Sequence, residues 1–393
     1  MVGIVGGVVG GTFVYGVNLA NEVWLDNRWL MYLLPFGGLI IVWLYHLCDY
    51  EKPRGTNRII DKVRARDEVS IVVAPLMFVA TLITHFLGGS AGREGAAIQI
   101  GGSIGSGMAK LCKVDEKDTS LIVLSGVAAV FAALFSTPVA AVFFGLEFIS
   151  VGVIYYSGLV PCLISSLTAY GVTKIMGIKS HQWNFISIPD ITGVLLIKVF
   201  IIGIMAALLS ILIVIVFSGS KKFFEAKFEN QYIRILVGGA IIIVLSMIFS
   251  SGDYNCSGSH VIEAALHGEA KPEAFLLKML FTAVTLGVGF KGGEIVPTFF
   301  MGATMGVLAG NLLGLDPGFA AALGLVATFC GAVNAPVASI ILSVELFGAA
   351  GLVFFAVCCA TSYTFSGYYS LYSSQKIVYS KTKAKYVNAD TRH

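Results

Sequence analysis

The sequence predicts an all-α polytopic membrane protein built from two inverted-topology repeats, with broken helices that converge near the midplane of the bilayer. Of its 393 residues, 56% are hydrophobic and 12% are charged, whereas soluble domains carry roughly 25% charged residues. The mean hydropathy is +0.85, and many apolar stretches approach the about 20 residues that a spanning helix needs. The remaining observation is that similar segments recur in the two halves of the chain.

The apolar stretches predict roughly ten to twelve helices, several of them too short to span the bilayer. Short segments interrupted by glycine indicate broken helices that do not all cross. The apolar start at Val2 is expected to form the first membrane helix and not a removable signal. We expect a single transmembrane domain over residues 1–393 and no soluble domain. The stretches lie near residues 3–20, 30–48, 69–88, 96–112, 119–149, 150–176, 193–218, 232–250, 274–290, 296–314, 318–347 and 350–370.

A proline motif appears in both halves of the chain. Pro138-Val139-Ala140 is followed by Glu147, and Pro336-Val337-Ala338 is followed by Glu345, in each case nine residues after the proline. Such self-similarity predicts a duplicated unit, with one repeat at about 30–176 and the other at about 193–375. Repeats of this kind build transporters when they are inverted in the membrane.

Several polar residues near the repeated prolines are expected to have structural roles. Glu147 and Glu345 are interpreted as helix-end or packing acids and not as proton carriers. Ser136 and Asn334, just before the two prolines, are expected to be helix caps. The Lys-rich segment 376–393 is expected to be a cytoplasmic tail, in keeping with the positive-inside rule.

Each proline motif follows a glycine-rich element that carries a glutamate. These elements are Gly92-Arg93-Glu94-Gly95-Ala96 and Gly292-Gly293-Glu294-Ile295-Val296-Pro297. Ionised groups inside a membrane are costly and mark ion or proton pathways. Glycines let the backbone approach a ligand, and a helix that begins there directs free N–H groups at an anion.

In order along the chain, these two elements and Ser370-Leu371-Tyr372-Ser373 resemble the motifs of the CLC family of chloride channels and anion/proton antiporters. The resemblance covers nearly the whole chain. It implies that Glu94 is the gating glutamate, that the Tyr372 hydroxyl meets the anion, and that the N–H groups of Ile295 and Val296 line the pathway. It also implies a homodimer and a multi-pass location in the cell's inner (plasma) membrane. The motif positions that it assigns are Gly92, Arg93, Gly95, Gly293 and Pro297.

Elementary chemistry supports the role of Glu94. Apolar surroundings favour the neutral form of a carboxyl group, so this side chain can occupy the anion's place when ionised and leave it when protonated. Arg93, its neighbour in sequence, points elsewhere on a helix, which makes it a structural or field-setting cation.

The sequence departs from the family pattern at three places. The region that corresponds to the family's chloride-binding serine reads Lys52-Pro53-Arg54-Gly55-Thr56-Asn57, in which Gly55, Thr56 and Asn57 are the candidate anion-binding residues. Glu294, a candidate proton site, stands where chloride transporters have an aliphatic residue. Phe148 stands near the position of their internal proton glutamate. These departures resemble the fluoride/proton antiporter branch of the family.

We therefore expect a secondary active antiporter that exports fluoride in exchange for protons. The alternatives are a chloride channel or a chloride/proton exchanger of the same family and, more remotely, an intramembrane enzyme. Ser259 and His260 are adjacent and no acid is assigned to them; His260 and His85 are interpreted as structural. We expect no cofactor, no metal site and no nucleic-acid partner, and the sequence contains no GxxxxGK[ST] motif for ATP.

Overall fold

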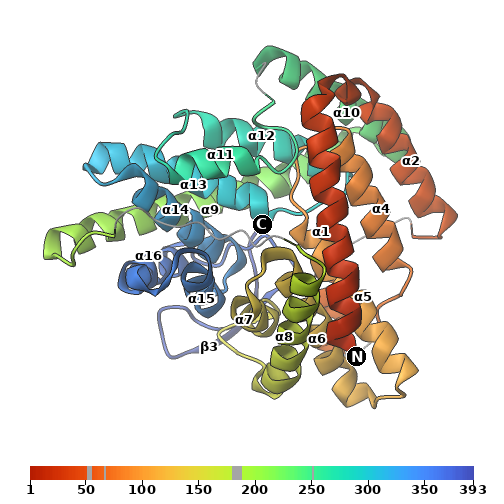
Figure 1. Ribbon diagram of the computed structural model, residues 1–393, viewed down its shortest axis with the longest axis horizontal. Coiled ribbons are helices and arrows are strands. Elements are labelled where there is room, and N and C mark those ends of the chain that lie inside the picture. The colour runs from red at the N-terminus through yellow and green to blue at the C-terminus, as the bar shows by residue number, and fades with distance from the viewer. Residues whose placement is uncertain (51–54, 66–67, 179–187, 250–251) are drawn as a thin grey trace.

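The structure, a computed structural model, describes residues 1–50, 55–65, 68–178, 188–249 and 252–393. Lys52, Pro53 and Arg54 of the predicted anion-binding region lie outside these residues. The described chain is mainly helical (Figure 1). Its helices are α1 (Val2–Asp26), α2 (Leu34–Leu47), α3 (Thr56–Ala65), α4 (Val73–Phe86), α5 (Glu94–Leu111), α6 (Glu116–Phe135), α7 (Pro138–Glu147), α8 (Leu159–Ile175), α9 (Gly193–Lys227), α10 (Gln231–Phe249), α11 (Ser259–Leu266), α12 (Ala274–Gly287), α13 (Ile295–Leu313), α14 (Pro317–Val333), α15 (Pro336–Phe347) and α16 (Leu352–Phe365).

The helices confirm an integral membrane protein. Among the described residues, seven helical segments are long and apolar enough to cross a membrane. Shorter apolar helices lie between them, as expected for broken membrane helices. The seven segments are Val2–Asp26, Arg28–Leu47, Asp118–Phe135, Tyr156–Ile175, Gly193–Lys227, Gln231–Phe249 and Ile295–Leu313.

Two of the predicted long stretches are each broken into two helices at equivalent points. Helix α6 ends at Ser136 and α14 ends at Asn334, both with a φ of 58° in the left-handed region. Pro138 and Pro336 then begin α7 and α15, where a missing N–H costs nothing. Ser136 and Asn334 are therefore helix caps, as expected, and they lie at the C-terminal ends of α6 and α14.

The same close helix crossing occurs in both halves of the chain. Helices α5 and α6 meet at Gly101 and Gly126, where a Cβ atom on Gly101 would lie 2.4 Å from the Gly126 carbonyl oxygen. Helices α13 and α14 meet at Gly302 and Gly324, and a Cβ atom on Gly302 would lie 2.5 Å from the Gly324 oxygen. Small residues let helix backbones approach inside a membrane, so glycine is required at both crossings.

Glu147 and Glu345 connect the two halves reciprocally. The Glu147 carboxylate accepts the N–H groups of Val337 and Ala338 at the start of α15, at 3.2 and 2.8 Å. The Glu345 carboxylate accepts those of Val139 and Ala140 at the start of α7, at 2.9 and 2.8 Å. Each acid thus satisfies free N–H groups at the helix start of the other repeat.

A small sheet, which the sequence did not predict, includes most of the expected tail. Strand β2 (Lys376–Tyr379) pairs in parallel with β1 (Ser150–Val151) and antiparallel with β3 (Tyr386–Asp390). The last residues contact the segment that precedes β2, where the Arg392 N–H donates to the Tyr368 oxygen at 2.8 Å. The C-terminal end accordingly lies near the centre of the view in Figure 1.

Candidate functional site

Helices α5 and α13 begin at the same point, and backbone hydrogen bonds join them there. The Gly92 N–H donates to the Gly293 oxygen at 2.7 Å, and the Gly293 N–H donates to the Gly92 oxygen at 2.8 Å. A Cβ atom on Gly293 would lie 2.6 Å from the N atoms of Glu94 and Gly95, and one on Gly92 would lie 2.9 Å from Pro297 Cδ. The glycines of both motifs are therefore required by the close approach of the two helix starts.

The Glu94 side chain lies between these two helix starts. It is completely buried, and its Oε2 accepts the N–H groups of Arg93 and Val296, each at 3.1 Å. Helix N-termini attract negative charge, so the carboxylate occupies a position suited to a bound anion. Its other oxygen, Oε1, is buried and has no hydrogen-bond partner among the described residues.

Tyr372 supplies a second buried polar atom of the same kind. The residue is 2% exposed, and its hydroxyl has no hydrogen-bond partner within the described part of the chain. Its ring and the Phe148 ring form a T-shaped pair, with 6.2 Å between the centroids. A buried polar group left without a partner is unfavourable, which makes the hydroxyl a natural donor to a ligand.

A cavity of about 820 Å³ adjoins this region. It is lined by Tyr372 and by Gly55, Thr56 and Asn57 at the start of α3, the residues in which the sequence predicted an anion-binding region. Asn57 also has a structural contact, because its Oδ1 accepts the Ser374 N–H at 2.9 Å. Ile295 and Val296 are buried and do not line the cavity.

Glu294 also lines this cavity. A Cβ atom on Gly95 would lie 3.3 Å from Glu294 Oε2, so this carboxylate is beside the start of α5. The cavity wall also includes Lys221, Arg234 and Lys291. Glu225 and Glu229 line it as well, so the cavity wall combines carboxylates with cations.

Helix α1 makes contacts near Glu94 that the sequence did not predict. Arg93 Nη1 donates to Asn18 Oδ1 at 2.6 Å. His85 is fully buried, with Nδ1 at 2.9 Å from Asn21 Oδ1 and Nε2 at 3.1 Å from the Gly92 oxygen. These contacts give Arg93 and His85 structural roles, as expected, and the asparagines carried no motif that could have identified them.

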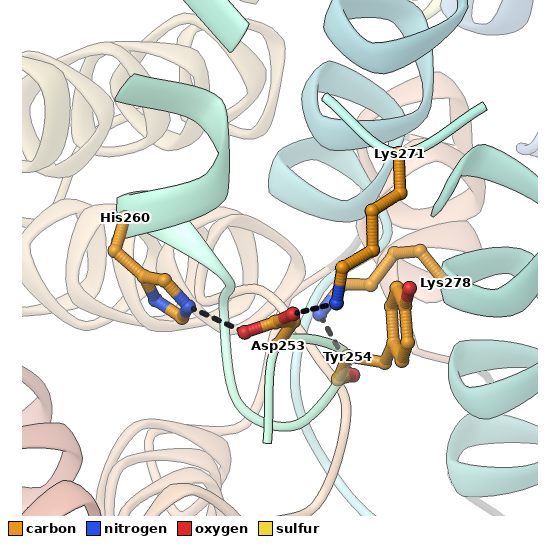
Figure 2. Close-up of polar contacts among 5 residues, drawn as sticks. All are labelled: Asp253, Tyr254, His260, Lys271 and Lys278. Carbon is orange, nitrogen blue, oxygen red and sulfur yellow. Dashed lines mark hydrogen bonds and ion pairs between the residues drawn. The ribbon is translucent and has the colours of Figure 1, made fainter. Parts of the chain in front are cut away.

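A polar cluster surrounds the loop before α11 (Figure 2). Asp253 pairs with Lys271 at 3.0 Å and with His260 at 3.4 Å, and its hydrogen bond with Lys271 raises the pKa of that lysine above its usual value. The Ser259 hydroxyl lies 2.9 Å from that of Ser257. The His260 ring therefore contacts an acid, and the Ser259 hydroxyl contacts another serine.

Lys278, on α12, is a fully buried cation in the same cluster. Its Nζ donates to the carbonyl oxygens of Tyr254 and Cys256, at 3.1 and 2.7 Å, and lies 5.2 Å from the centre of the Phe300 ring. The Cys256 oxygen also accepts the Ala91 N–H at 3.2 Å. Lys278 therefore links α12 to the segment that precedes the Glu94 motif.

Known proteins are similar to this chain over most of its length. A family profile described as "Voltage gated chloride channel" matches residues 37–367. A "Chloride/fluoride channel protein" of Pseudomonas syringae pv. tomato is 30% identical over 97% of this chain and 86% of its own length. An "H(+)/Cl(-) exchange transporter ClcA" of Vibrio vulnificus is 24% identical over 88% of this chain and 80% of its own.

Solved structures match over almost the full length. The crystal structure of a CLC-type fluoride/proton antiporter superposes with a TM-score of 0.93 and 29% identity, covering 96% of each chain. A slow cyanobacterial Cl⁻/H⁺ antiporter superposes with a TM-score of 0.78 and 19% identity, covering 93% of this chain and 92% of its own. The second likeness concerns the fold alone.

Proposed function

The chain belongs to the voltage-gated chloride channel family, and on that basis we propose that it exports fluoride in exchange for protons. The family consists of channels and transporters. The observation that carries the proposal is the Glu94 carboxylate, which is buried at the joined starts of α5 and α13 in the position that an anion would occupy.

Glu94 is the gate in this proposal. Ionised, its carboxylate accepts the Val296 N–H and blocks the helix N-terminus. Protonated, it carries no charge for the helix end to attract, so it leaves and an anion replaces it. One proton therefore moves the gate each time, which couples proton movement to anion movement.

Tyr372 and Glu294 lie on the cavity side of this gate. The Tyr372 hydroxyl, which has no partner among the described residues, donates to the anion. Glu294 takes up the proton that Glu94 releases, because its carboxylate lies beside the start of α5. Lys221, Arg234 and Lys291 attract the anion into the cavity through their positive charge.

Fluoride is favoured over chloride by the residues that surround the pathway. Fluoride is a small anion that accepts strong hydrogen bonds. Hydrogen bonds to a charged acceptor are stronger than those between neutral groups. Phe148, whose side chain cannot take up a proton, contacts the Tyr372 ring. Glu294 provides a second carboxyl group besides Glu94; it belongs to the glycine-rich motif at the start of α13 and lines the cavity. The "CLC-type fluoride/proton antiporter" is also similar over almost the whole chain.

The test is anion efflux from proteoliposomes that contain the purified protein. We expect fluoride efflux far faster than chloride efflux, and we expect a proton gradient alone to drive fluoride uphill. Chloride efflux that equals or exceeds fluoride efflux would support the chloride alternative. A fluoride flux that does not depend on the proton gradient would indicate a channel.

We also propose that the protein is a homodimer in the plasma membrane with its C-terminal hairpin in the cytoplasm. Support for the dimer comes from α8, whose outer face carries the exposed Val160, Leu163, Ile164 and Leu167. Apolar helix faces of this kind pack against lipid or against a second copy. Single-molecule subunit counting in bilayers tests this, and a single bleaching step for most particles would contradict it.

A further inference from the structure

The segment that carries Tyr372 is a tight turn, and hydrogen bonds hold the backbone of Tyr372 in place. The Gln375 N–H donates to the Tyr372 oxygen at 3.0 Å, and the Tyr372 N–H donates to the Ser370 hydroxyl at 3.1 Å. Thr391, which follows β3, donates its hydroxyl to the Tyr372 oxygen at 3.1 Å. The backbone of Tyr372 is thus fixed on both sides, although its side-chain hydroxyl has no partner among the described residues.

The Gln375 side chain fastens this turn to the rest of the molecule. Its amide nitrogen donates to the carbonyl oxygens of Phe148 and Val333, both at 3.0 Å. Its Oε1 accepts the Ser370 hydroxyl at 2.8 Å and Asn334 Nδ2 at 3.1 Å. Every donor of this fully buried amide is used.

The residues that hold Gln375 come from both repeats. Phe148 follows α7, and Val333 is the last residue of α14. On the hairpin, Lys381 Nζ donates to Asn334 Oδ1 at 2.5 Å and to the Tyr363 oxygen at 2.9 Å. The C-terminal hairpin is therefore joined to the ends of α14 and α16 at the same place as the Tyr372 turn.

We propose that Gln375 is a positioning residue for Tyr372, which sets where the tyrosine hydroxyl lies in the anion pathway. This inference rests on the proposed function, in which that hydroxyl donates to the transported anion. The tip of the tyrosine has no hydrogen bond within the described chain, so the turn and the contact with Phe148 determine its position. A small shift of a donor weakens a charge-assisted hydrogen bond sharply.

The test combines Gln375→Glu with Tyr372→Phe in a double-mutant cycle. A carboxylate at position 375 cannot donate to the two carbonyl oxygens, so the turn shifts. We expect the KM for fluoride to rise about tenfold with a smaller change in maximal rate, as for the loss of one good hydrogen bond. In the Tyr372→Phe background, which lacks the hydroxyl, the same substitution should change KM less than about twofold.

Lys376→Gln is the matched control. It removes only an exposed ion pair with Asp390 in the same hairpin and should leave KM unchanged. Equal effects of Gln375→Glu in the two backgrounds would overturn the inference, as would an unchanged KM. If Gln375→Glu does not fold, Gln375→Met replaces it in the cycle, because it removes the same two donors without adding a charge.

Failure of the inference and failure of the proposed function give different results. The KM is measured for whichever halide the wild-type protein carries. A wild-type protein that does not exchange fluoride for protons contradicts the proposed function. The coupling between Gln375 and Tyr372 remains measurable in that case with chloride.

Discussion

At the scale of single residues, two of the buried oxygens that have no hydrogen-bond partner among the described residues are the most informative atoms. Glu94 Oε1 and the Tyr372 hydroxyl lie at the candidate site, and neither has a hydrogen bond within the described chain. Native proteins satisfy the great majority of buried polar groups, and exceptions call for an explanation such as a ligand or a catalytic role. In the proposed function, both are explained by an anion that accepts a hydrogen bond from Tyr372 and by a proton that Glu94 takes up.

The reciprocal caps allow a direct prediction about Glu147 and Glu345. Substitution of either acid by Gln removes the charge that two backbone N–H groups contact, so we expect each variant to lose about 1–3 kcal/mol of stability. The proton coupling of the folded fraction should remain, because we interpret both acids as structural and not as proton carriers. Thermal unfolding in detergent and proton-driven fluoride uptake measure the two effects.

Glu263→Gln, at an exposed position on α11, is the control for these variants and should unfold like the wild type. Loss of proton coupling in Glu147→Gln, with unfolding unchanged, would contradict the structural role.

Sequence reasoning pointed to Glu94, Glu294 and Tyr372, because each lies in a recognisable motif. It did not find Asn18 and Asn21, which hold Arg93 and His85. These contacts join α1 to a segment that is distant in sequence. The sequence of an apolar helix does not show which residue a polar side chain on it will contact. Only the packing of α1 against α4 and α5 brings them together.

At the scale of elements, the helix crossings predict opposite effects for two kinds of glycine. Gly101→Ala and Gly302→Ala place a methyl group against a backbone oxygen, so we expect each to lose about 1–3 kcal/mol or fail to fold. A Cβ atom on Gly219, in α9, would have no neighbouring atom within 4 Å. Gly219→Ala should be neutral or gain up to about 1 kcal/mol through helix propensity.

Thermal unfolding of the three glycine variants in the same detergent is the measurement. Equal unfolding temperatures for Gly101→Ala and Gly219→Ala would mean that α5 and α6 do not approach as closely as the structure has them.

The C-terminal hairpin should dock in a pH-dependent way through Lys381. Burial lowers the pKa of this lysine from its ordinary value of 10.5 to about 7; its neighbours are Tyr363 and Cys330. Between these two pH values the undocked, solvated lysine holds a proton that the docked one has released. Docking therefore strengthens as the pH rises above about 7 and does not change with pH below it.

Hydrogen exchange of residues 376–390 at about pH 7 and about pH 9 measures this effect, after correction for the intrinsic exchange rates. We expect protection to increase with pH in the wild type and to stay constant in Lys381→Met. The same increase in both proteins would rule out Lys381 as the titrating group.

The hairpin also marks a limit of the sequence prediction at this scale. Residues 376–393 are rich in lysine and were expected to form a tail. The segment folds because Ile377 is buried and β2 pairs with β1, a strand of only two residues that precedes it by more than half the chain. Such a short, distant strand has no periodicity of its own to detect.

At the scale of the whole molecule, the two repeats explain how the site is built. Each repeat supplies a helix start, α5 or α13, and the glycine bridge between Gly92 and Gly293 joins them. The repeated motifs predicted this convergence. The Tyr372 turn is not part of the two helix starts. Gln375 joins it to residues of both repeats.

In the proposed function, Glu94 alternates between blocking the anion pathway and carrying a proton. The most direct measurement is proton-driven fluoride uptake into proteoliposomes that contain Glu94→Gln, with Glu263→Gln as the matched control. We expect the control to accumulate fluoride like the wild type, and Glu94→Gln to lose all proton-driven accumulation because glutamine cannot titrate. Proton-coupled fluoride uptake that persists in Glu94→Gln would contradict the account.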